Sequence, residues 1–156
     1  MQILVVSDTH GDYVTFRRLV MSKPKAEVVI FCGDGSDDLD NVKNYFPDKM
    51  FIGVRGNNDW CSSLPQKEIR VIAGKTFYIT HGHLEHVKYG LSELKSAARR
   101  QNADVILFGH THVPYTEYDN GMWIMNPGSL RRFDLSYGLI DIQNNQILVN
   151  TAYFNA

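Results

Sequence analysis

The sequence has little cysteine: Cys32 and Cys61 are its two cysteines, and they fit no Cys-x-x-Cys pattern. It also has no apolar run near the ~20 residues that a membrane-spanning helix needs, and Met1 begins no signal-peptide pattern. We therefore expect a cytoplasmic protein with reduced thiols and no membrane partner. No linker, repeat or low-complexity segment interrupts the chain, so residues 1–156 are expected to form a single domain.

An excess of charge of either sign is absent as well. The chain has 16 Lys and Arg against 17 Asp and Glu, which gives a net charge of −1. A protein that binds nucleic acid over a broad surface needs a basic excess, so no nucleic-acid partner is expected. What the chain does have is 44% hydrophobic and 12% aromatic residues, enough to bury a substantial core.

The order of apolar and polar segments predicts an α/β fold. The first part alternates strands and helices, with strands predicted over residues 2–6, 28–31 and 51–54 and helices over 13–21 and 38–46. The second part is predicted to contain a hairpin of residues 68–72 and 75–80, a helix over 92–100 and a buried strand over 105–108. Two further hairpins, with turns at 120–121 and 144–145, are predicted from the strands 115–118, 122–125, 136–141 and 146–151. This order predicts two mixed β-sheets packed together.

Metal-competent side chains directly follow five of the predicted strands. They are Asp8, His10, Asp34, Asn57, His81, His110 and His112. Ligands in open α/β sheets bind at the carboxyl ends of the strands. Two carboxylates, one amide oxygen and four imidazoles are too many for one structural zinc ion and suit two ions. The mixed oxygen and nitrogen donors favour manganese, with iron, zinc, cobalt or nickel as alternatives.

Two divalent ions about 3.5–4 Å apart are a known device for hydrolysing phosphate esters, and they need no serine or cysteine nucleophile. Each stretch alone has a plainer interpretation. Asp8 or Thr9 could cap the following helix, Gly33-Asp34-Gly35 could form a turn, and residues 56–59 could be a simple loop. The metal centre is favoured because all these stretches occur in one chain, and the plainer interpretations would have to hold for every one of them at once.

Five blocks of the sequence, taken together, resemble the motifs of the calcineurin-like metallophosphoesterases. The blocks are Asp8-Thr9-His10, Gly33-Asp34, Gly56-Asn57-Asn58-Asp59, Thr80-His81-Gly82-His83 and Gly109-His110-Thr111-His112. The short length and the late Asn126-Pro127-Gly128-Ser129 segment look most like the small single-domain phosphodiesterases, the YfcE-like branch. The resemblance implies a four-layer α/β/β/α sandwich with two mixed sheets flanked by helices.

The resemblance also implies roles for the candidate ligands. One ion would be held by Asp8, His10 and His112, and the other by Asn57, His81 and His110, with Asp34 bridging the two. The implied reaction is that of a phosphodiesterase which attacks phosphorus with a metal-bridging hydroxide and forms no covalent intermediate. The substrate expected is a small phosphate ester, and formation of a homo-oligomer stays open.

One position departs from the family pattern. Many members have histidine after the Gly-Asn pair, where this chain has Asn58. An amide can donate a hydrogen bond but cannot transfer a proton near pH 7, so we expect a preference for diesters with good leaving groups. His83 is an alternative proton donor, and Asp59 is expected to orient ligands rather than bind metal. The alternative functions are a phosphomonoesterase of the same fold, a metal-binding scaffold for protein assembly, and a nuclease, for which no basic groove is visible.

Three further side chains near these blocks have two interpretations each. Arg131 and Arg132 are interpreted as surface charge, with contact to a substrate phosphate as the alternative. Trp60 either lines the mouth of the site or packs against the protein.

Overall fold

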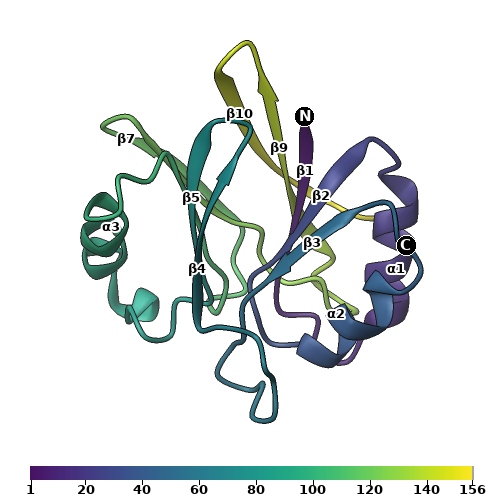
Figure 1. The fold of residues 1–156 in the computed structure, drawn as a ribbon. Coiled ribbons are helices and arrows are strands. Elements are labelled where there is room, and N and C mark those ends of the chain that lie inside the picture. The colour runs from purple at the N-terminus through teal and green to yellow at the C-terminus, as the bar shows by residue number, and fades with distance from the viewer. Residues whose placement is uncertain (156) are drawn as a thin grey trace.

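The structure is a computed structural model that describes residues 1–155. Two five-stranded sheets pack against each other (Figure 1). The first sheet has the strand order β10-β9-β1-β2-β3, formed by β1 (Gln2–Val6), β2 (Ala26–Phe31), β3 (Met50–Gly53), β9 (Ser136–Gln143) and β10 (Gln146–Tyr153). The second has the order β4-β5-β6-β8-β7, formed by β4 (Lys67–Ile72), β5 (Lys75–Thr80), β6 (Val105–Leu107), β7 (Tyr115–Asp119) and β8 (Met122–Asn126).

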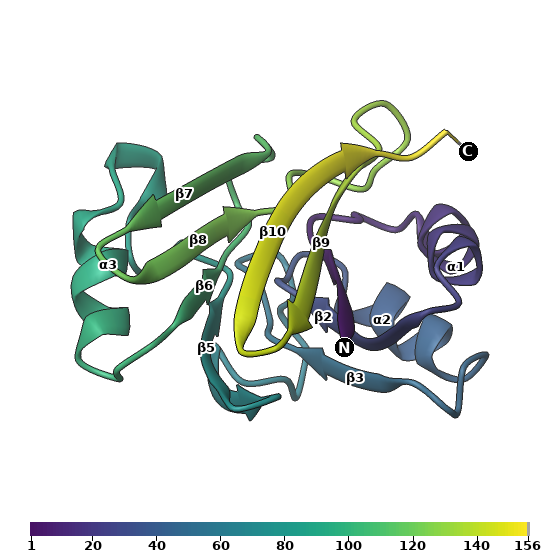
Figure 2. The same cartoon turned by 90° about the horizontal axis from the view of Figure 1, so that it is seen from above.

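Helices cover the outer faces of the two sheets, as the view from above shows (Figure 2). The helices α1 (Tyr13–Ser22) and α2 (Ser36–Lys43) lie on the first sheet, and α3 (Ser92–Arg99) lies on the second. The predicted α/β/β/α sandwich with two mixed sheets is therefore confirmed. None of the helices in residues 1–155 is long and apolar enough to span a bilayer.

Alternation along the strands produces three apolar layers. On β1, Ile3 and Val5 face the second sheet, whereas Leu4 and Val6 face the helices α1 and α2. Strand β5 contributes to the same layer as Ile3 and Val5, because the Phe77 side chain lies between the two sheets. A strand that is buried on both faces reads as a continuous apolar run, which is why these segments were recognisable in the sequence.

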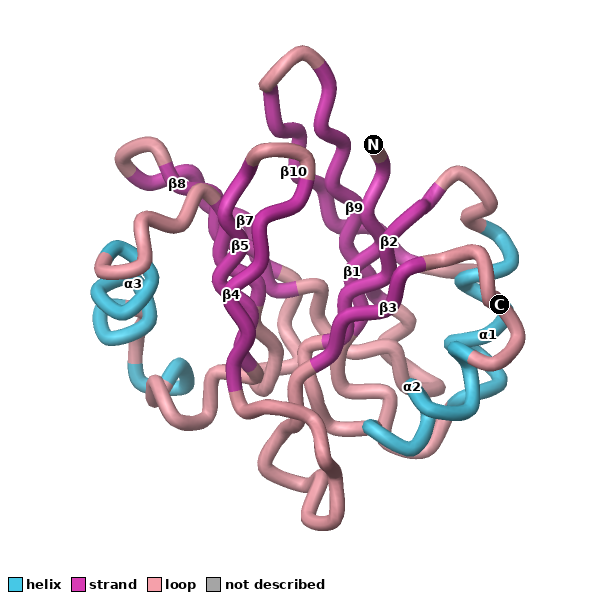
Figure 3. Tube along the Cα trace, in the orientation of Figure 1, coloured by secondary structure: helices cyan, strands magenta, loops and turns pink. Residues whose placement is uncertain are grey.

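Parallel pairing places the ends of six strands on one side of the molecule. Strands β1, β2 and β3 are parallel within the first sheet, and β5, β6 and β8 are parallel within the second. The loops that leave these strands gather below the two sheets in the tube drawing (Figure 3). This end of the molecule carries the predicted ligands.

Local differences from the predicted elements have identifiable causes. Helix α2 starts at Ser36, two residues before the predicted start, because the Asp59 carboxylate accepts the backbone N–H groups of Gly35 and Ser36. The N-cap of α1 is Asp12, which accepts from the backbone of Thr15, so the proposed cap at Asp8 or Thr9 is wrong. A short 3-10 helix, η1 (Val87–Tyr89), lies in a segment for which no helix was predicted.

Candidate metal centre

Five loops bring the seven predicted ligands to the carboxyl ends of the strands. The side chains come from the loops after β1, β2, β3, β5 and β6, and they are Asp8, His10, Asp34, Asn57, His81, His110 and His112. Asp8 and His81 are fully buried, and Asp34 is 3% exposed. Buried carboxylates at the end of a sheet need a positive partner, which is either a protonated imidazole or a bound cation.

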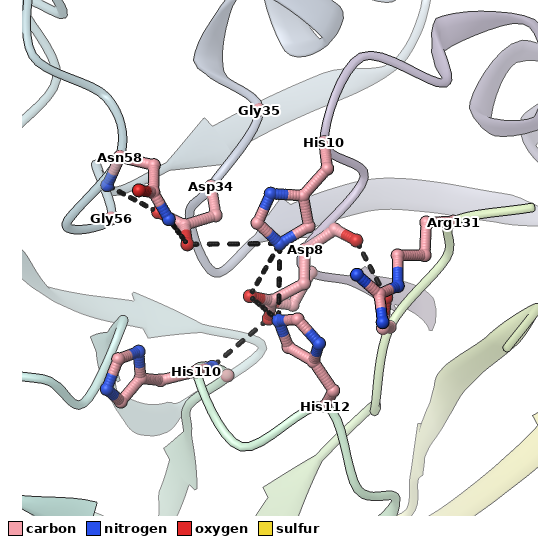
Figure 4. A network of polar contacts seen from close by, with 12 residues as sticks. Asp8, His10, Asp34, Gly35, Gly56, Asn58, His110, His112 and Arg131 are labelled. Atoms are coloured by element: carbon pink, nitrogen blue, oxygen red, sulfur yellow. Dashed lines mark hydrogen bonds and ion pairs between the residues drawn. The ribbon is translucent and has the colours of Figure 1, made fainter.

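The first group of converging atoms contains Asp8, His10 and His112 (Figure 4). The Nε2 atoms of His10 and His112 are 3.2 Å apart. The Oδ1 atom of Asp8 lies 3.0 Å from His112 Nε2 and 3.6 Å from His10 Nε2. Three potential ligand atoms therefore face one point, as the donor set of a metal site requires.

The second group contains Asp8, Asp34 and His81. The Nε2 atom of His81 lies 3.4 Å from Asp34 Oδ2 and 4.0 Å from Asp8 Oδ1. The amide oxygen of Asn57 is 3.0 Å from the same nitrogen. The other ring nitrogen of His81 lies 2.7 Å from the carbonyl oxygen of Cys32. Because a carbonyl can only accept, Nδ1 donates to Cys32, and Nε2 is the nitrogen that would bind metal.

The carboxylate of Asp34 lies between the two groups. Its Oδ2 atom is 3.9 Å from His10 Nε2 and 3.4 Å from His81 Nε2. Asn58 fixes this carboxylate from the outside, since its backbone N–H donates to Oδ1 at 2.9 Å and its side-chain amide donates to Oδ2 at 2.7 Å. This is the position that a bridging ligand would need.

The carboxylate of Asp8 provides a test of whether a cation fits. Its Oδ2 atom accepts hydrogen bonds from the Ser7 hydroxyl and from the backbone N–H of His110. Its Oδ1 atom is buried and has no hydrogen-bond partner among the described residues. A buried carboxylate oxygen without a partner is costly, and a metal ion held jointly with the neighbouring imidazoles would satisfy it. The donor atoms present thus fit divalent metal.

The imidazole of His110 belongs to neither group of converging atoms. Its ring centroid lies 5.0 Å from that of His81 and 6.1 Å from that of His83. His110 contacts the centre through its backbone N–H, and Figure 4 shows its ring turned away from Asp8. The role of His110 as a ligand therefore stays a prediction, as does that of His83 as a proton donor.

The carboxylates and imidazoles of the centre shift one another's pKa values. Burial alone would raise the pKa of Asp34, but the close contact and charge of His81 and the hydrogen bonds from Asn58 lower it to about 2. Contact with the Asp8 carboxylate raises the pKa of His10, and the carboxylates of Asp34 and Asp8 raise the pKa of His81 against the effect of burial. By contrast, burial and the charge of His81 lower the pKa of His110 to about 4.

Five of the predicted ligands have a left-handed backbone. The φ angles are 54° at Asp8, 46° at His10, 60° at Asp34, 68° at His110 and 61° at His112. This region is unfavourable for residues with a Cβ atom, and such strain clusters at functional sites. The loop after β6 is also tightly packed: a Cβ atom at Gly109 would lie 2.0 Å from Ser7 Oγ and 2.6 Å from Asp8 Oδ2.

Several polar residues outside the predicted ligand set hold these loops in place. Asp38 accepts the Thr9 hydroxyl and the backbone N–H of Gly11. The Asn126 amide donates to the carbonyl of Gly109. Ser129 donates its hydroxyl to the backbone carbonyl of Asp8 at 2.9 Å. The late Asn126–Ser129 block marked the last two, but nothing in the sequence distinguishes Asp38 from other helical carboxylates.

The expected orienting role of Asp59 is realised through the backbone. Its carboxylate accepts four backbone N–H groups at 2.8–3.0 Å, those of Asp34, Gly35, Ser36 and Gly56. It thereby joins the loop after β3 to the loop after β2, so Asn57, Asn58 and Asp34 are positioned together.

A comparison with protein families decides the classification. Residues 1–145 match the model of the calcineurin-like phosphoesterase superfamily domain. The chain belongs to the calcineurin-like phosphoesterase superfamily. Two curated relatives within this superfamily cover most of the sequence. The probable metallophosphoesterase YsnB of Bacillus subtilis is 28% identical over 96% of this chain and 89% of its own length. The phosphodiesterase YfcE of Escherichia coli is 27% identical over 90% of this chain and 88% of its own length.

Solved structures show the same superfamily fold. A predicted phosphoesterase from Streptococcus pneumoniae superposes with a TM-score of 0.80 at 23% identity, over 97% of this chain and 88% of the other. Vps29 from Entamoeba histolytica, solved in complex with zinc, superposes with a TM-score of 0.75 at 22% identity, over 99% of this chain and all of the other. At these identities the likeness concerns the fold.

Proposed function

We propose that this phosphoesterase is a two-metal phosphodiesterase that acts on small phosphate esters. The observation that carries the proposal is the convergence of two groups of ligand atoms on Asp8 Oδ1, which has no hydrogen-bond partner among the described residues, with Asp34 between the groups. The relative named phosphodiesterase YfcE supports the diester specificity. The cytoplasmic location stays a prediction of the sequence.

Two divalent ions, when bound, would supply a water activated at neutral pH and stabilise the charge on the attacking and leaving oxygens. The residues Asp8, His10 and His112 would hold one ion. Asn57 and His81 would hold the other, with Asp34 shared and His110 as a further candidate. Manganese is proposed because oxygen and imidazole donors are mixed.

Asn58 sets the expected leaving-group preference. Its amide already donates to Asp34 Oδ2 at 2.7 Å, so it lies beside the proposed bridging carboxylate. Because an amide has no transferable proton near pH 7, a leaving group at this position departs without protonation by Asn58. Diesters with good leaving groups are therefore the preferred substrates, and His83 stays the alternative source of a proton.

The test uses protein stripped with a chelator and reloaded with Mn²⁺, assayed on bis(p-nitrophenyl) phosphate and on p-nitrophenyl phosphate. We expect metal-dependent turnover with the diester ahead of the monoester. Asp34→Ala should lower diester turnover by about a thousandfold while circular dichroism shows a folded protein, since removing a catalytic unit costs such factors. Asp40→Asn, which changes an exposed carboxylate on α2, is the matched control.

The other outcomes either reject the mechanism or identify a different function. Near-normal turnover by Asp34→Ala would reject the two-metal mechanism. A faster reaction with the monoester would identify a phosphomonoesterase. The likeness to zinc-bound Vps29 favours a metal-binding scaffold as the second candidate, and metal binding without turnover of either ester would support it.

A further inference from the structure

A hollow of about 460 Å³ opens beside the candidate metal centre. It extends from His10, Asp34 and Asn58 to Trp60 and the start of α2. Its described lining contains neither lysine nor arginine, but it does contain Asp37. A substituent on a phosphate held at the metal centre would point either into this hollow or into solvent.

The indole of Trp60 is 85% exposed, although tryptophan is usually well buried. Its loop is nevertheless fixed. The neighbouring Asp59 accepts four backbone N–H groups, and the Asp59 carbonyl accepts the N–H of Ser62 at 3.3 Å. At the base of the loop, Arg55 donates its backbone N–H to the carbonyl of Pro65 at 2.9 Å. A large aromatic face is therefore presented at the wall of the hollow by an anchored loop.

Among the carboxylates around the hollow, Asp37 is the one that neither joins loops nor belongs to the metal centre. The carboxylate of Asp38 accepts hydrogen bonds from Thr9 and Gly11, and that of Asp59 joins two loops. Asp34 belongs to the metal centre. Asp37 is exposed in the first turn of α2 and forms no ion pair with any residue in 1–155. It gives the hollow a negative charge that is not paired with a cationic side chain of the described residues.

Positive charge lies on the opposite side of the centre. Figure 4 shows Arg131 beside His10 and Asp8, on the side away from Asn58. Arg131 Nε is 2.8 Å from Asp134 Oδ2, and its side chain is half exposed. The centre therefore has the Arg131–Asp134 ion pair on one flank and, on the other, a hollow with a carboxylate and an indole. This asymmetry would orient a substrate that carries an anionic phosphate and a positively charged substituent.

We propose that the hollow binds a cationic substituent of the phosphodiester, a quaternary ammonium group such as that of choline, between Trp60 and Asp37. This inference rests on the proposed phosphodiesterase function and adds its substrate class. An aromatic face with a nearby carboxylate is the chemistry that recognises quaternary ammonium. A second anionic group would instead meet Asp37 at a helix start where Asp59 already accepts the N–H groups of Gly35 and Ser36.

Three p-nitrophenyl phosphodiesters that differ only in the second substituent test the proposal. The probes are the choline ester, its uncharged isostere the 3,3-dimethylbutyl ester, and the anionic carboxymethyl ester. In each, the oxygen of water bonds to phosphorus and the P–O bond to the aryl group breaks. The p-nitrophenolate leaves with the electron pair, and the proton of water goes to solvent. The leaving group is thus constant, and differences in kcat/KM report the effect of the second substituent.

For the Mn²⁺-loaded wild type we expect kcat/KM to be about five- to tenfold higher for the choline ester than for the dimethylbutyl ester, and lowest for the carboxymethyl ester. Exposed cation–π contacts and surface ion pairs each have effects of this order. Asp37→Asn should lower the ratio of kcat/KM for the choline ester to kcat/KM for the dimethylbutyl ester, close to the ratio expected from Trp60 alone. Trp60→Ala should reduce it further than Trp60→Phe does. Asp40→Asn on the same helix should leave it unchanged.

A ratio of one or less in the wild type, or a ratio that Asp37→Asn and Trp60→Ala do not alter, would overturn the proposal. Calorimetric binding of phosphocholine against 3,3-dimethylbutyl phosphate separates this failure from failure of the proposed function. If no ester is hydrolysed but phosphocholine binds more tightly and Asp37→Asn removes the difference, the phosphodiesterase proposal fails and the cation site stands. If the esters are hydrolysed without discrimination, the cation site is rejected and the phosphodiesterase proposal stands.

Discussion

Replacing Asp59 by asparagine tests whether one carboxylate holds the loops of the metal centre together. Asp59 Oδ2 accepts the backbone N–H groups of Asp34 and Gly56 at 2.8 Å, and Oδ1 accepts those of Gly35 and Ser36 at 2.9 and 3.0 Å. The asparagine amide keeps the shape but turns an NH₂ group toward two of these donors. Two bonds to a charged acceptor are then lost, and each contributes about 1.5–3 kcal/mol.

The four bonds share one carboxylate, so their contributions do not simply add. We expect the free energy of unfolding of the metal-free protein to fall by about 3 kcal/mol. Urea unfolding followed by circular dichroism would show a lower midpoint with an unchanged slope. For a chain of this size the corresponding decrease in Tm is about 6–12 °C. Diester turnover should fall too, because Asp34 and Asn58 lose their common anchor.

The control is Asp40→Asn, which removes an exposed carboxylate that pairs with Lys43 on the surface of α2. Such pairs contribute about 0–1 kcal/mol. If Asp59→Asn loses less than about 1 kcal/mol, or no more than Asp40→Asn, then the four N–H groups do not depend on the carboxylate and the reasoning is refuted.

Two further predictions concern proton positions. Burial and the Glu85 carboxylate raise the pKa of Tyr78 to about 12, so its neutral form stabilises the fold fully below the unfolded pKa of about 10, and this contribution is lost as pH rises through 12. Tyr78→Phe should therefore reduce the fall in unfolding free energy between about pH 9 and pH 11 by about 1.4 kcal/mol in urea titrations; an unaltered pH dependence would contradict the assignment. Asn58→His should raise kcat/KM about tenfold for alkyl phosphodiesters, because imidazole can protonate a poor leaving group. If kcat/KM for alkyl phosphodiesters does not rise relative to kcat/KM for p-nitrophenyl esters, residue 58 does not reach the leaving oxygen.

Much of the fold was predictable because its central strands are buried on both faces. The run Val29-Ile30-Phe31 in β2 has no polar residue, and β1 is apolar from Ile3 to Val6. Hairpin turns were recognisable for a similar local reason, since Asn120-Gly121 adopts the two positive φ angles that such turns need. The candidate ligands followed from their placement directly after these strands.

The rest depends on contacts between residues far apart in the sequence. Asp59 lies 24 positions from Gly35, and Ser129 lies 121 positions from Asp8, so no local pattern identifies either bond. His110 has a left-handed backbone and follows Gly109, which packs tightly against Ser7, and the Gly-His-x-His pattern specifies neither feature. A motif therefore predicted which loops meet, but not which atom of each loop faces the centre.

The left-handed residues explain how straight strands can deliver side chains to one cavity. A strand that continued past Val6 or Phe31 would carry its side chains alternately to the two faces of the sheet, away from the space below it. A single positive φ at Asp8 or Asp34 breaks this alternation at the first residue that must point inward. Each such residue costs about 1–2 kcal/mol, and two neighbouring carboxylates repel each other as well. The surrounding hydrogen bonds, from Ser7 to Asp8 and from Asn58 to Asp34, offset part of this cost. Asp8 Oδ1 has no hydrogen-bond partner among the described residues, and a bound cation is the group whose charge would offset more of this cost.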